Sequence, residues 1–282
     1  MRSVLITGTS TGIGLVTAVE LAKQGWRVFA TMRNLEKKGP LETALQTAGA
    51  AENVDISALD VTNAASVKAG VDDVLAKTGG FLDAVVHNAG VAVGGAFEDM
   101  PDADQRRVME TNFWGVLELT RALLPMFRAQ RKGRILIVSS ESGFAGQPAN
   151  SIYCASKFAI EGWAESVCYE LEPFGIDVVL VEPGPYRTEI WASSPRICPE
   201  GSPYRTWVQY MFRAGDAHES AHGRDPQEVA VRIAKVLAAQ RPSFRNPVGR
   251  IARLNHFLRG KIPSPLLRKG VQRYLGLHRI RI

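Results

Sequence analysis

The feature that most constrains the fold of this chain is a repeated alternation of short apolar segments with longer amphipathic ones. Short apolar runs are typical of buried strands, and the amphipathic stretches between them are typical of helices that cover a sheet. Because parallel strands need crossover helices between them, the alternation predicts an α/β fold with a doubly wound parallel sheet in three layers, α/β/α. We expect strands at residues 4–7, 27–32, 54–59, 82–86, 135–138, 176–181 and, at one edge, 244–248.

The helices are expected between these strands. The longest amphipathic stretch, 102–130, carries a break near 109–111. Asn63 and Asp225 are residue types that cap helix N-termini, and Pro226 suits the first helical position. We expect helices at residues 15–24, 41–48, 63–77, 102–130, 151–171 and 226–239.

The first strand leads into a glycine-rich turn, Gly8-Thr9-Ser10-Thr11-Gly12-Ile13-Gly14, and then into a helix. Glycine allows a tight turn and a close approach of backbone to a phosphate, and the free N–H groups at the start of a helix attract an anion. The turn therefore predicts a dinucleotide site, although its spacing is GxxxGxG rather than GxGxxG. The alternative is a tight βα turn that binds nothing.

Tyr153 and Lys157 are four residues apart, and Ser140 lies thirteen residues before Tyr153. Four residues make about one helical turn, so both side chains emerge on the same face. A nearby ammonium favours the anionic form of a phenol, so Lys157 is expected to lower the pKa of Tyr153. This spacing arises by chance in many sequences and gains meaning only with the other motifs.

Composition bounds the class of protein. A chain of 282 residues that is 45% hydrophobic can build a sizeable core. Cys154, Cys168 and Cys198 form no paired or metal-like pattern, which indicates free thiols in a reducing compartment. The sequence enters a strand almost at once and holds no apolar run long enough to span a bilayer, so we expect a cytoplasmic protein.

The net charge of +6 is unevenly placed. Residues 241–282 hold 11 of the 34 Lys and Arg and no Asp or Glu, so 23 basic and 28 acidic residues remain in 1–240. We expect one catalytic domain, 1–250, followed by a basic, weakly amphipathic helical extension, 251–282. Its charges are either simply solvated or give peripheral contact with an anionic membrane. No nucleic-acid motif accompanies the charge, and no nucleic-acid partner is expected.

The strand and helix pattern dissolves in residues 186–224, which predicts a long functional loop inserted in the domain. The segment His218-Glu219-Ser220-Ala221-His222 matches HExxH, a zinc-protease motif. Gly215, Gly223 and Pro226 leave little helix around it, so no metal site is predicted.

In their order along residues 3–248, these motifs resemble the short-chain dehydrogenases/reductases, a family of Rossmann fold. The glycine turn from Thr7 resembles the family's cofactor loop, and Ser140, Tyr153 and Lys157 match its active-site trio. His87 departs from the asparagine that is more usual before Asn88, and we expect it to be a packed or hydrogen-bonded core residue. The other matching landmarks are Asp60 and Val61 after the third strand, the segment Asn88-Ala89-Gly90, Asn112 on the long helix, and Pro183-Gly184 with Thr188.

The resemblance implies hydride transfer between a nicotinamide and a carbonyl or carbinol carbon. It implies that Tyr153 is the general acid or base, that Lys157 holds the nicotinamide ribose, and that Ser140 holds the substrate oxygen. Asn112 would position a water that links Lys157 to solvent. The rival hypothesis is a non-catalytic NADP-binding sensor or scaffold on the same fold.

The cofactor and substrate follow from neighbouring residues. NAD enzymes usually place an acid at the end of the second strand, but here Met32 is followed by Arg33, whose guanidinium suits the 2′-phosphate of NADP. NADP is therefore expected, and NAD is the alternative. The resemblance is strongest to the 17β-hydroxysteroid and retinol dehydrogenase branch, which implies a lipophilic ketone or alcohol and a homodimer or tetramer. The residues expected to contact substrate are Ser140, Ser142, Phe144, Gln147, Tyr153, Tyr186 and Trp191.

Overall fold

The computed structural model describes residues 1–258, 261–274 and 276. Its main sheet has seven strands, all parallel, in the order β3-β2-β1-β4-β6-β7-β9. The chain crosses from β3 back to the far side of β1 to form β4, so the direction of winding changes between β1 and β4. The strands are β1 (Ser3–Thr7), β2 (Arg27–Met32), β3 (Val54–Ala58), β4 (Ala84–His87), β6 (Gly133–Val138), β7 (Ile176–Pro183) and β9 (Arg245–Val248).

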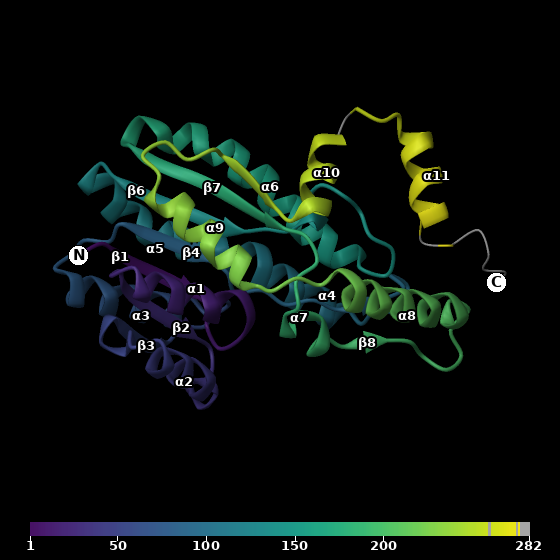
Figure 1. Cartoon of the computed structure of the whole chain (residues 1–282), viewed down its shortest axis with the longest axis horizontal. Helices are drawn as coiled ribbons and strands as arrows, with labels where there is room; N and C mark the ends of the chain where they lie inside the picture. The colour runs from purple at the N-terminus through teal and green to yellow at the C-terminus, as the bar shows by residue number, and fades with distance from the viewer. Residues whose placement is uncertain (259–260, 275, 277–282) are drawn as a thin grey trace.

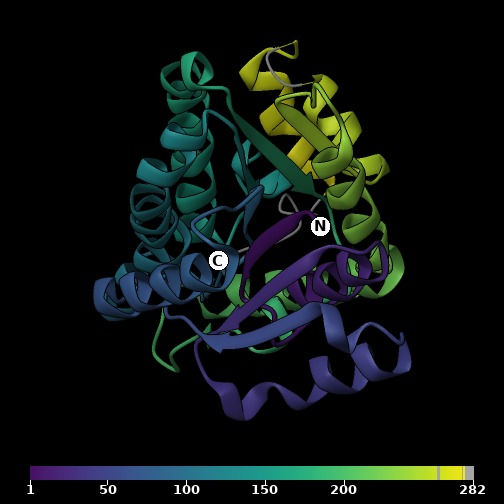
Figure 2. The ribbon, with the colours of Figure 1, turned by 90° about the vertical axis from the view of Figure 1, so that its left-hand side faces the viewer.

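Helices cover both faces of this sheet (Figures 1 and 2). On one face lie α1 (Gly12–Lys23), α2 (Gly39–Thr47) and α9 (Gln227–Ala238), and on the other lie α3 (Ala64–Thr78), α5 (Gly115–Gln130) and α6 (Ser151–Leu171). The predicted doubly wound α/β/α fold is confirmed. The predicted bounds of α6 coincide with those observed.

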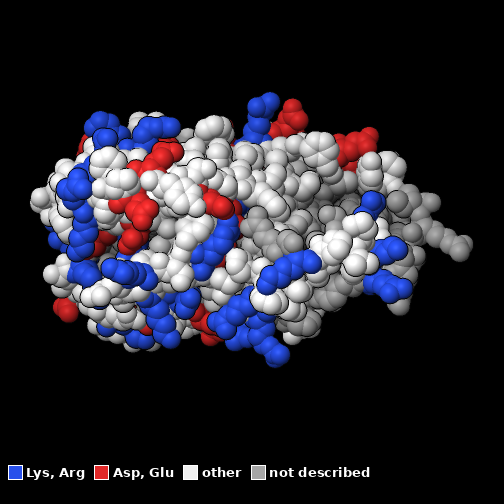
Figure 3. Space-filling model, turned by 90° about the horizontal axis from the view of Figure 1, so that it is seen from above, with Lys and Arg blue, Asp and Glu red and all other residues white. Residues whose placement is uncertain are grey.

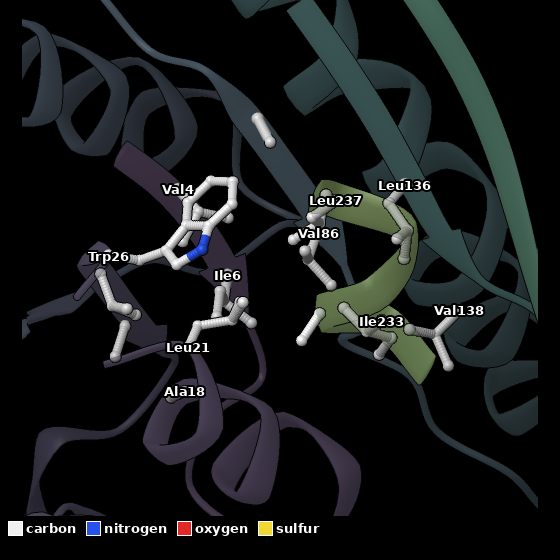
Figure 4. Close-up of a cluster of buried hydrophobic side chains, with 14 of the residues drawn as sticks. Val4, Ile6, Ala18, Leu21, Trp26, Val86, Leu136, Val138, Ile233 and Leu237 are labelled. Atoms are coloured by element: carbon white, nitrogen blue, oxygen red, sulfur yellow. The ribbon is translucent and has the colours of Figure 1, made fainter. Parts of the chain in front are cut away.

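The hydrophobic core is divided by the sheet into two halves. Figure 4 shows part of the half beneath α1 and α9, where Trp26 and Leu21 pack near Val4 and Ile6 of β1. Ile233 and Leu237 of α9 close the same half against β4 and β6. Because the strands are buried on both faces, their side chains are apolar nearly throughout, which explains the short continuous apolar runs in the sequence.

The long amphipathic stretch forms two helices joined by a π-helical turn. The turn, Glu110–Trp114, lies between α4 (Asp102–Met109) and α5. It coincides with the predicted break, and it carries the buried Asn112. Single π-helical turns often mark functional positions within a helix, because the extra residue changes which side chains face inward.

The segment predicted as one long loop is largely structured, so that prediction was wrong. It contains α7 (Glu189–Ala192), β8 (Arg196–Ile197) and the long α8 (Arg205–His222), which lie together beyond the sheet in Figure 1. The β8 strand pairs with β5 (Gly94–Gly95), and α8 buries Val208 and Met211. The large apolar side chains of α8 lie in its first half, 207–212, whereas 213–222 holds small, polar and charged residues, so no stripe of large apolar residues runs along the whole helix.

The HExxH segment forms the C-terminal end of α8, so the expectation of little helix around it was wrong for the residues that precede it. Even so, among the residues that the structure describes, no group of three or more His, Cys, Asp or Glu is placed to hold a metal ion.

The basic tail begins with α10 (Arg250–Leu258) and α11 (Ser264–Tyr274). The buried Ala252 of α10 packs beside Gly184, so α10 rests on the body of the molecule near the end of β7. Within the described ranges, no helix has the length and apolar character needed to cross a bilayer.

Candidate active site

The glycine turn and the Asn88 segment meet where the winding of the sheet changes direction. Thr7 Oγ1 accepts hydrogen bonds from the backbone N–H groups of Asn88 (3.1 Å) and Ala89 (3.0 Å). A Cβ added to Gly8, which has a φ of +71°, would lie 2.8 Å from the Cα atom of Ala89. Two loops about 80 residues apart in sequence therefore form one structural unit at the carboxyl edge of the sheet, where such folds bind ligands.

The start of α1 suits the phosphates of a dinucleotide. Thr11 is the N-cap, its side chain makes no capping hydrogen bond, and the first turn contains no acidic residue. The N–H groups at this end therefore have no competing carboxylate, and they can meet an anion. A Cβ added to Gly12 would lie 3.4 Å from Thr188 Cβ, so Thr188 faces the same turn. Residues of the expected cofactor cradle are thus brought together from the ends of β1, β4 and β7.

The remaining cofactor residues flank this cradle. Arg33 is exposed directly after the buried Met32, at the carboxyl end of β2. Asp60 Oδ1 accepts hydrogen bonds from the backbone and side chain of Thr62, which closes the turn after β3, and Val61 packs under Gly115. Pro183 ends β7 and Gly184 follows it.

Asn112 ties the π-helical turn to the loop after β4 and to α6. Its Oδ1 accepts from the backbone N–H of Val91 (2.8 Å), and its Nδ2 donates to Val91 O (2.9 Å) and to Ser156 Oγ (3.0 Å). The Ser156 hydroxyl donates in turn to Tyr153 O (2.7 Å). These contacts show Asn112 as a brace between the loop after β4 and the helix that carries Tyr153.

Ser140, Tyr153 and Lys157 are brought together at the carboxyl end of β6. Tyr153 and Lys157 are both buried on α6, and Lys157 Nζ lies 5.8 Å from the centre of the Tyr153 ring. The Lys157 ammonium donates to Val138 O at 3.0 Å, and Ser140 Oγ accepts from the backbone N–H of Ser142 at 3.1 Å. Strand β6 therefore sets the position of both the lysine and the serine.

Burial governs the acid–base properties of this group. It raises the pKa of Tyr153 to about 12, although a hydrogen bond with Ser140 acts in the opposite direction. It also lowers the pKa of Lys157 to about 8, and the nearby charge of Glu161 opposes that change. The expected lowering of the Tyr153 pKa is thus reversed, because the loss of hydration on burial outweighs the hydrogen bond with Ser140. At neutral pH the phenol carries its proton and can donate it.

Three of the predicted substrate residues, Trp191, Ser142 and Phe144, lie near this group, and a fourth, Gln147, lines a hollow that Tyr153 and Ser140 do not line. The rings of Trp191 and Tyr153 meet edge to face with centroids 5.1 Å apart. Ser142 is buried in the turn after Ser140, and Phe144 is buried just beyond it. Gln147, with Ser151 at the start of α6, lines a largely apolar hollow of about 590 Å³, whose wall also includes Phe97, Pro148 and Trp207.

The prediction that Tyr186 contacts substrate was wrong. Its side chain is buried in the core beneath α9, and its hydroxyl donates to Glu228 Oε2 at 2.9 Å. It therefore points away from Tyr153, and the loop after β7 contributes Trp191 to the site in its place.

His87 is a core residue, as expected. It is buried at the end of β4, its Nε2 lies 3.0 Å from Thr120 Oγ1 of α5, and burial lowers its pKa to about 3. The neutral imidazole therefore joins β4 to α5 and takes no part in proton transfer at the site.

Comparison with known proteins decides the family. Residues 2–196, more than half of the chain, match the family model described as short chain dehydrogenase. The chain is a short-chain dehydrogenase/reductase. The sequence of this dehydrogenase is 39% identical to retinol dehydrogenase 8 of Bos taurus over 86% of this chain and 80% of that protein. It is 36% identical to human 17-beta-hydroxysteroid dehydrogenase type 1 over 86% and 76% of the two chains.

Solved structures of related reductases resemble this one. A short-chain dehydrogenase/reductase from Burkholderia phymatum in complex with NAD has a TM-score of 0.77 and 25% identity, over 91% of this chain and 93% of that one. A variant of actinorhodin polyketide ketoreductase with NADPH has a TM-score of 0.75 and 30% identity, over 88% and 95%. Structural relatives of this reductase therefore bind either nicotinamide cofactor.

Sequence reasoning missed three residues that support the site of this dehydrogenase. Glu161 is buried one helical turn beyond Lys157, which was a usable signal because it extends the Tyr153 and Lys157 stripe. Asn255 and His256 of α10 contact Glu141 (3.2 Å) and the Phe144 ring (centroids 5.7 Å apart). No local pattern could reveal those two contacts, because they join segments more than 110 residues apart.

Proposed function

We propose that this enzyme interconverts a carbonyl and an alcohol on a lipophilic substrate with NADP(H), and that Tyr153 is its general acid and base. The observation that carries the proposal is the group formed at the carboxyl end of β6 by the buried Tyr153 and Lys157 and the half-buried Ser140. When bound, the nicotinamide supplies or accepts the hydride. The protein must then orient the substrate oxygen and move one proton.

Each side chain has a distinct role in that step. Tyr153 donates its phenolic proton to the developing alkoxide during reduction and takes it back during oxidation. Ser140 binds the same oxygen, and its hydrogen bond to Tyr153 keeps the two hydroxyl groups on one target. Lys157, held by Val138 O, places its positive charge beneath the phenol and binds the ribose of the cofactor. Asn112 holds the helices in register and orders a water between Lys157 and solvent.

The cofactor preference is assigned to Arg33. It is exposed at the end of β2, where a carboxylate would bind the ribose hydroxyl of NAD, and its guanidinium matches a 2′-phosphate. The preference is tested by comparing kcat/KM with NADPH and NADH in the native enzyme and in Arg33→Asp. We expect NADPH to be favoured, and Arg33→Asp to lose at least about tenfold of that preference. A native preference for NADH would remove Arg33 from this role.

The substrate class is supported by the side chains around Tyr153. Trp191 and Phe144 are aromatic, and the hollow beside Gln147 is largely apolar, which suits a steroid, a retinoid or a similar lipid. The relatives named retinol dehydrogenase and 17-beta-hydroxysteroid dehydrogenase point the same way.

The deciding experiment is a screen of NADPH oxidation and NADP reduction against steroids, retinoids and aromatic ketones. The native enzyme is expected to turn over at least one of them, and Tyr153→Phe to lose roughly 100-fold or more in kcat while it still binds NADPH. Cofactor binding without turnover across the panel would instead favour the non-catalytic sensor. Near-native turnover by Tyr153→Phe would overturn the assignment of the acid.

A homodimer or tetramer is supported by large side chains on the outer faces of the π-helical turn and α6. Trp114, Phe158 and Tyr169 are all exposed, and Phe113 packs against Trp114. Sedimentation equilibrium of the native chain and of Tyr169→Arg tests this surface. A monomeric native enzyme would contradict it.

Contact of the tail with an anionic membrane is a weaker hypothesis. Leu254, Phe257 and Leu266 are exposed on α10 and α11, which carry Lys and Arg but no acidic residue. The face in Figure 3, however, shows Lys and Arg in separate groups rather than in one continuous patch. Co-sedimentation with phosphatidylserine vesicles, with and without residues 250–282, distinguishes a docking tail from a solvated one.

A further inference from the structure

A buried carboxylate that the proposed mechanism does not use lies directly behind the catalytic group. Glu161 is on α6, one turn beyond Lys157 and two beyond Tyr153, and its side chain is only 2% exposed. A buried charge is costly unless it is paired, so such a residue needs a structural or functional reason.

One oxygen of Glu161 holds the turn that carries Ser140. Ser139 Oγ donates to Glu161 Oε1 at 2.8 Å, while the Ser139 backbone N–H donates to Val181 O of β7 at 2.8 Å. Gly143, at the end of the same turn, packs so closely on this carboxylate that an added Cβ would overlap Oε1. The carboxylate therefore contacts Ser139 and Gly143, the two residues that flank the segment from Ser140 to Ser142.

The other oxygen of Glu161 is held by a guanidinium from the edge strand. Arg245 Nη1 lies 2.5 Å from Glu161 Oε2 and 2.8 Å from Glu182 Oε1, and Arg245 Nη2 lies 3.0 Å from Glu165 Oε2. Glu161 is thus fixed from two sides, by Ser139 and by Arg245, and its orientation relative to Lys157 is set by β7 and β9 as well as by its own helix.

The charged and titratable groups around Lys157 and Glu161 come from four elements. Tyr153 and Glu161 of α6 lie next to Lys157, and the charge of Glu141 after β6 acts on Tyr153. Glu182 of β7 and Arg245 of β9 act on Glu161. Of these, Glu161 is the one whose charge favours the ammonium form of Lys157, against the burial that disfavours it. Removing that charge leaves the lysine buried without this support.

We propose that Glu161 is a positioning residue for catalysis: its oxygens fix the turn that carries Ser140, and its negative charge supports the ammonium of Lys157. The inference rests on the proposed function for its kinetic consequence, but not for its effect on Lys157. Glu161 touches neither substrate nor cofactor in this role. It acts through Ser140 and Lys157.

The experiment compares Glu161→Gln with Glu165→Gln in the full chain. Glu165 is on the same helix and forms an ion pair with the same arginine, through Arg245 Nη2. Its side chain is 55% exposed, so it serves as the matched control for the buried Glu161. With lysine labelled by ¹³C at Cε, and the Lys157 signal assigned by its loss in Lys157→Arg, the titration of Lys157 is followed by NMR. We expect Glu161→Gln to move the titration midpoint to lower pH and Glu165→Gln to leave it unchanged.

The steady-state kinetics of Glu161→Gln and Glu165→Gln are measured as a function of pH. For Glu161→Gln we expect the basic limb of the kcat/KM profile for reduction to move to lower pH, and kcat to fall by roughly 10- to 100-fold. A Lys157 midpoint and a pH profile that both stay at native values would overturn the proposal, even if activity or Tm fell, because the role would then be structural only. A shifted midpoint in an enzyme that turns over nothing would instead mean that the proposed function fails while the positioning role stands.

Ser139→Ala keeps the proposal testable if Glu161→Gln does not fold. This variant removes the hydrogen bond to Oε1 and leaves the ion pair with Arg245 in place. We expect a lower kcat with the Lys157 midpoint unchanged. A native kcat in Ser139→Ala would overturn the claim that Glu161 fixes the serine turn.

Discussion

The side-chain amide of Asn88 donates a hydrogen bond of 2.9 Å to the carbonyl oxygen of Gly8. It donates a second, also 2.9 Å, to Thr7 O. Gly14 completes the unit, because a Cβ added there would overlap both the Gly8 oxygen and the Asn88 nitrogen. The cofactor turn is therefore held by a partner from the next loop, and its shape depends on the absence of one side chain.

Gly14→Ala is predicted to disrupt this unit. The methyl group must displace backbone, not a flexible side chain, so we expect a lower Tm and at least a tenfold loss of NADPH affinity, measured by fluorescence titration. Gly215→Ala is the matched control, since Gly215 is exposed in the interior of α8 and an added Cβ there meets nothing within 4 Å. That variant should bind NADPH normally and be stabilised by about 0.5–1 kcal/mol. Normal NADPH binding by Gly14→Ala would contradict the close packing.

His87 is predicted to make the enzyme sensitive to acid. Its pKa is lowered from 6.5 to about 3, so only the unfolded chain takes up this proton between those values. The contribution to stability is present above pH 6.5 and is lost as the pH falls toward 3, by up to about 1.4 kcal/mol per pH unit. Urea unfolding from pH 7 to 4 should therefore show a shallower pH dependence for His87→Asn than for the native enzyme. Parallel curves would mean that the buried imidazole is not the acid-sensitive group.

Glu182 is predicted to destabilise the enzyme as the pH rises. Burial, and then the charge of Glu161, raise its pKa from 4.5 to about 7, and its Oε2 has no hydrogen-bond partner in the described part of the chain. A raised carboxyl pKa gives stability that is present below pH 4.5 and is lost as the pH rises through 7.

The variant Glu182→Gln removes that dependence, because its amide stays neutral and can still accept from Arg245. We expect it to gain stability relative to the native enzyme between pH 5 and pH 8, on the order of 2 kcal/mol. Thermal unfolding at the two pH values measures the difference. Equal effects of the substitution at both would contradict the raised pKa.

Helix α10 is predicted to shape the substrate side of the site. Asn255 Nδ2 donates to Glu141 Oε2 at 3.2 Å, next to Ser140, and the ring of His256 packs on Phe144. Asn255→Ala with His256→Ala should release the turn after Ser140 and raise KM for a bulky ketone several-fold, while the Kd for NADPH is unchanged. Leu254→Ala, at an exposed position on the same helix, is the control and should leave KM unaltered. A native KM in the double variant would place α10 outside the pocket.

The sequence predicted most of the sheet and its crossover helices, because each buried strand and each covering helix has its own local period. It located α6 and the break at Glu110–Trp114, where local pattern and structure agree. It failed for α8, whose burial depends on a few contacts with distant loops, and for Tyr186, which lies near the site in sequence but points into the core beneath α9. Neither outcome is encoded in a short stretch of residues.

By itself, the sequence determined the order of strands and helices and the spacing that puts Tyr153 and Lys157 on one face of α6. Only the tertiary structure decided what surrounds them. Burial by surrounding elements reverses the expected change in the Tyr153 pKa. The contact of Glu161 with Ser139 joins α6 to the end of β6. The contacts of α10 with Glu141 and Phe144 join segments that are far apart in the chain. Local periodicity reports which face of an element is apolar, whereas hydration and charge at a site depend on every element that packs around it.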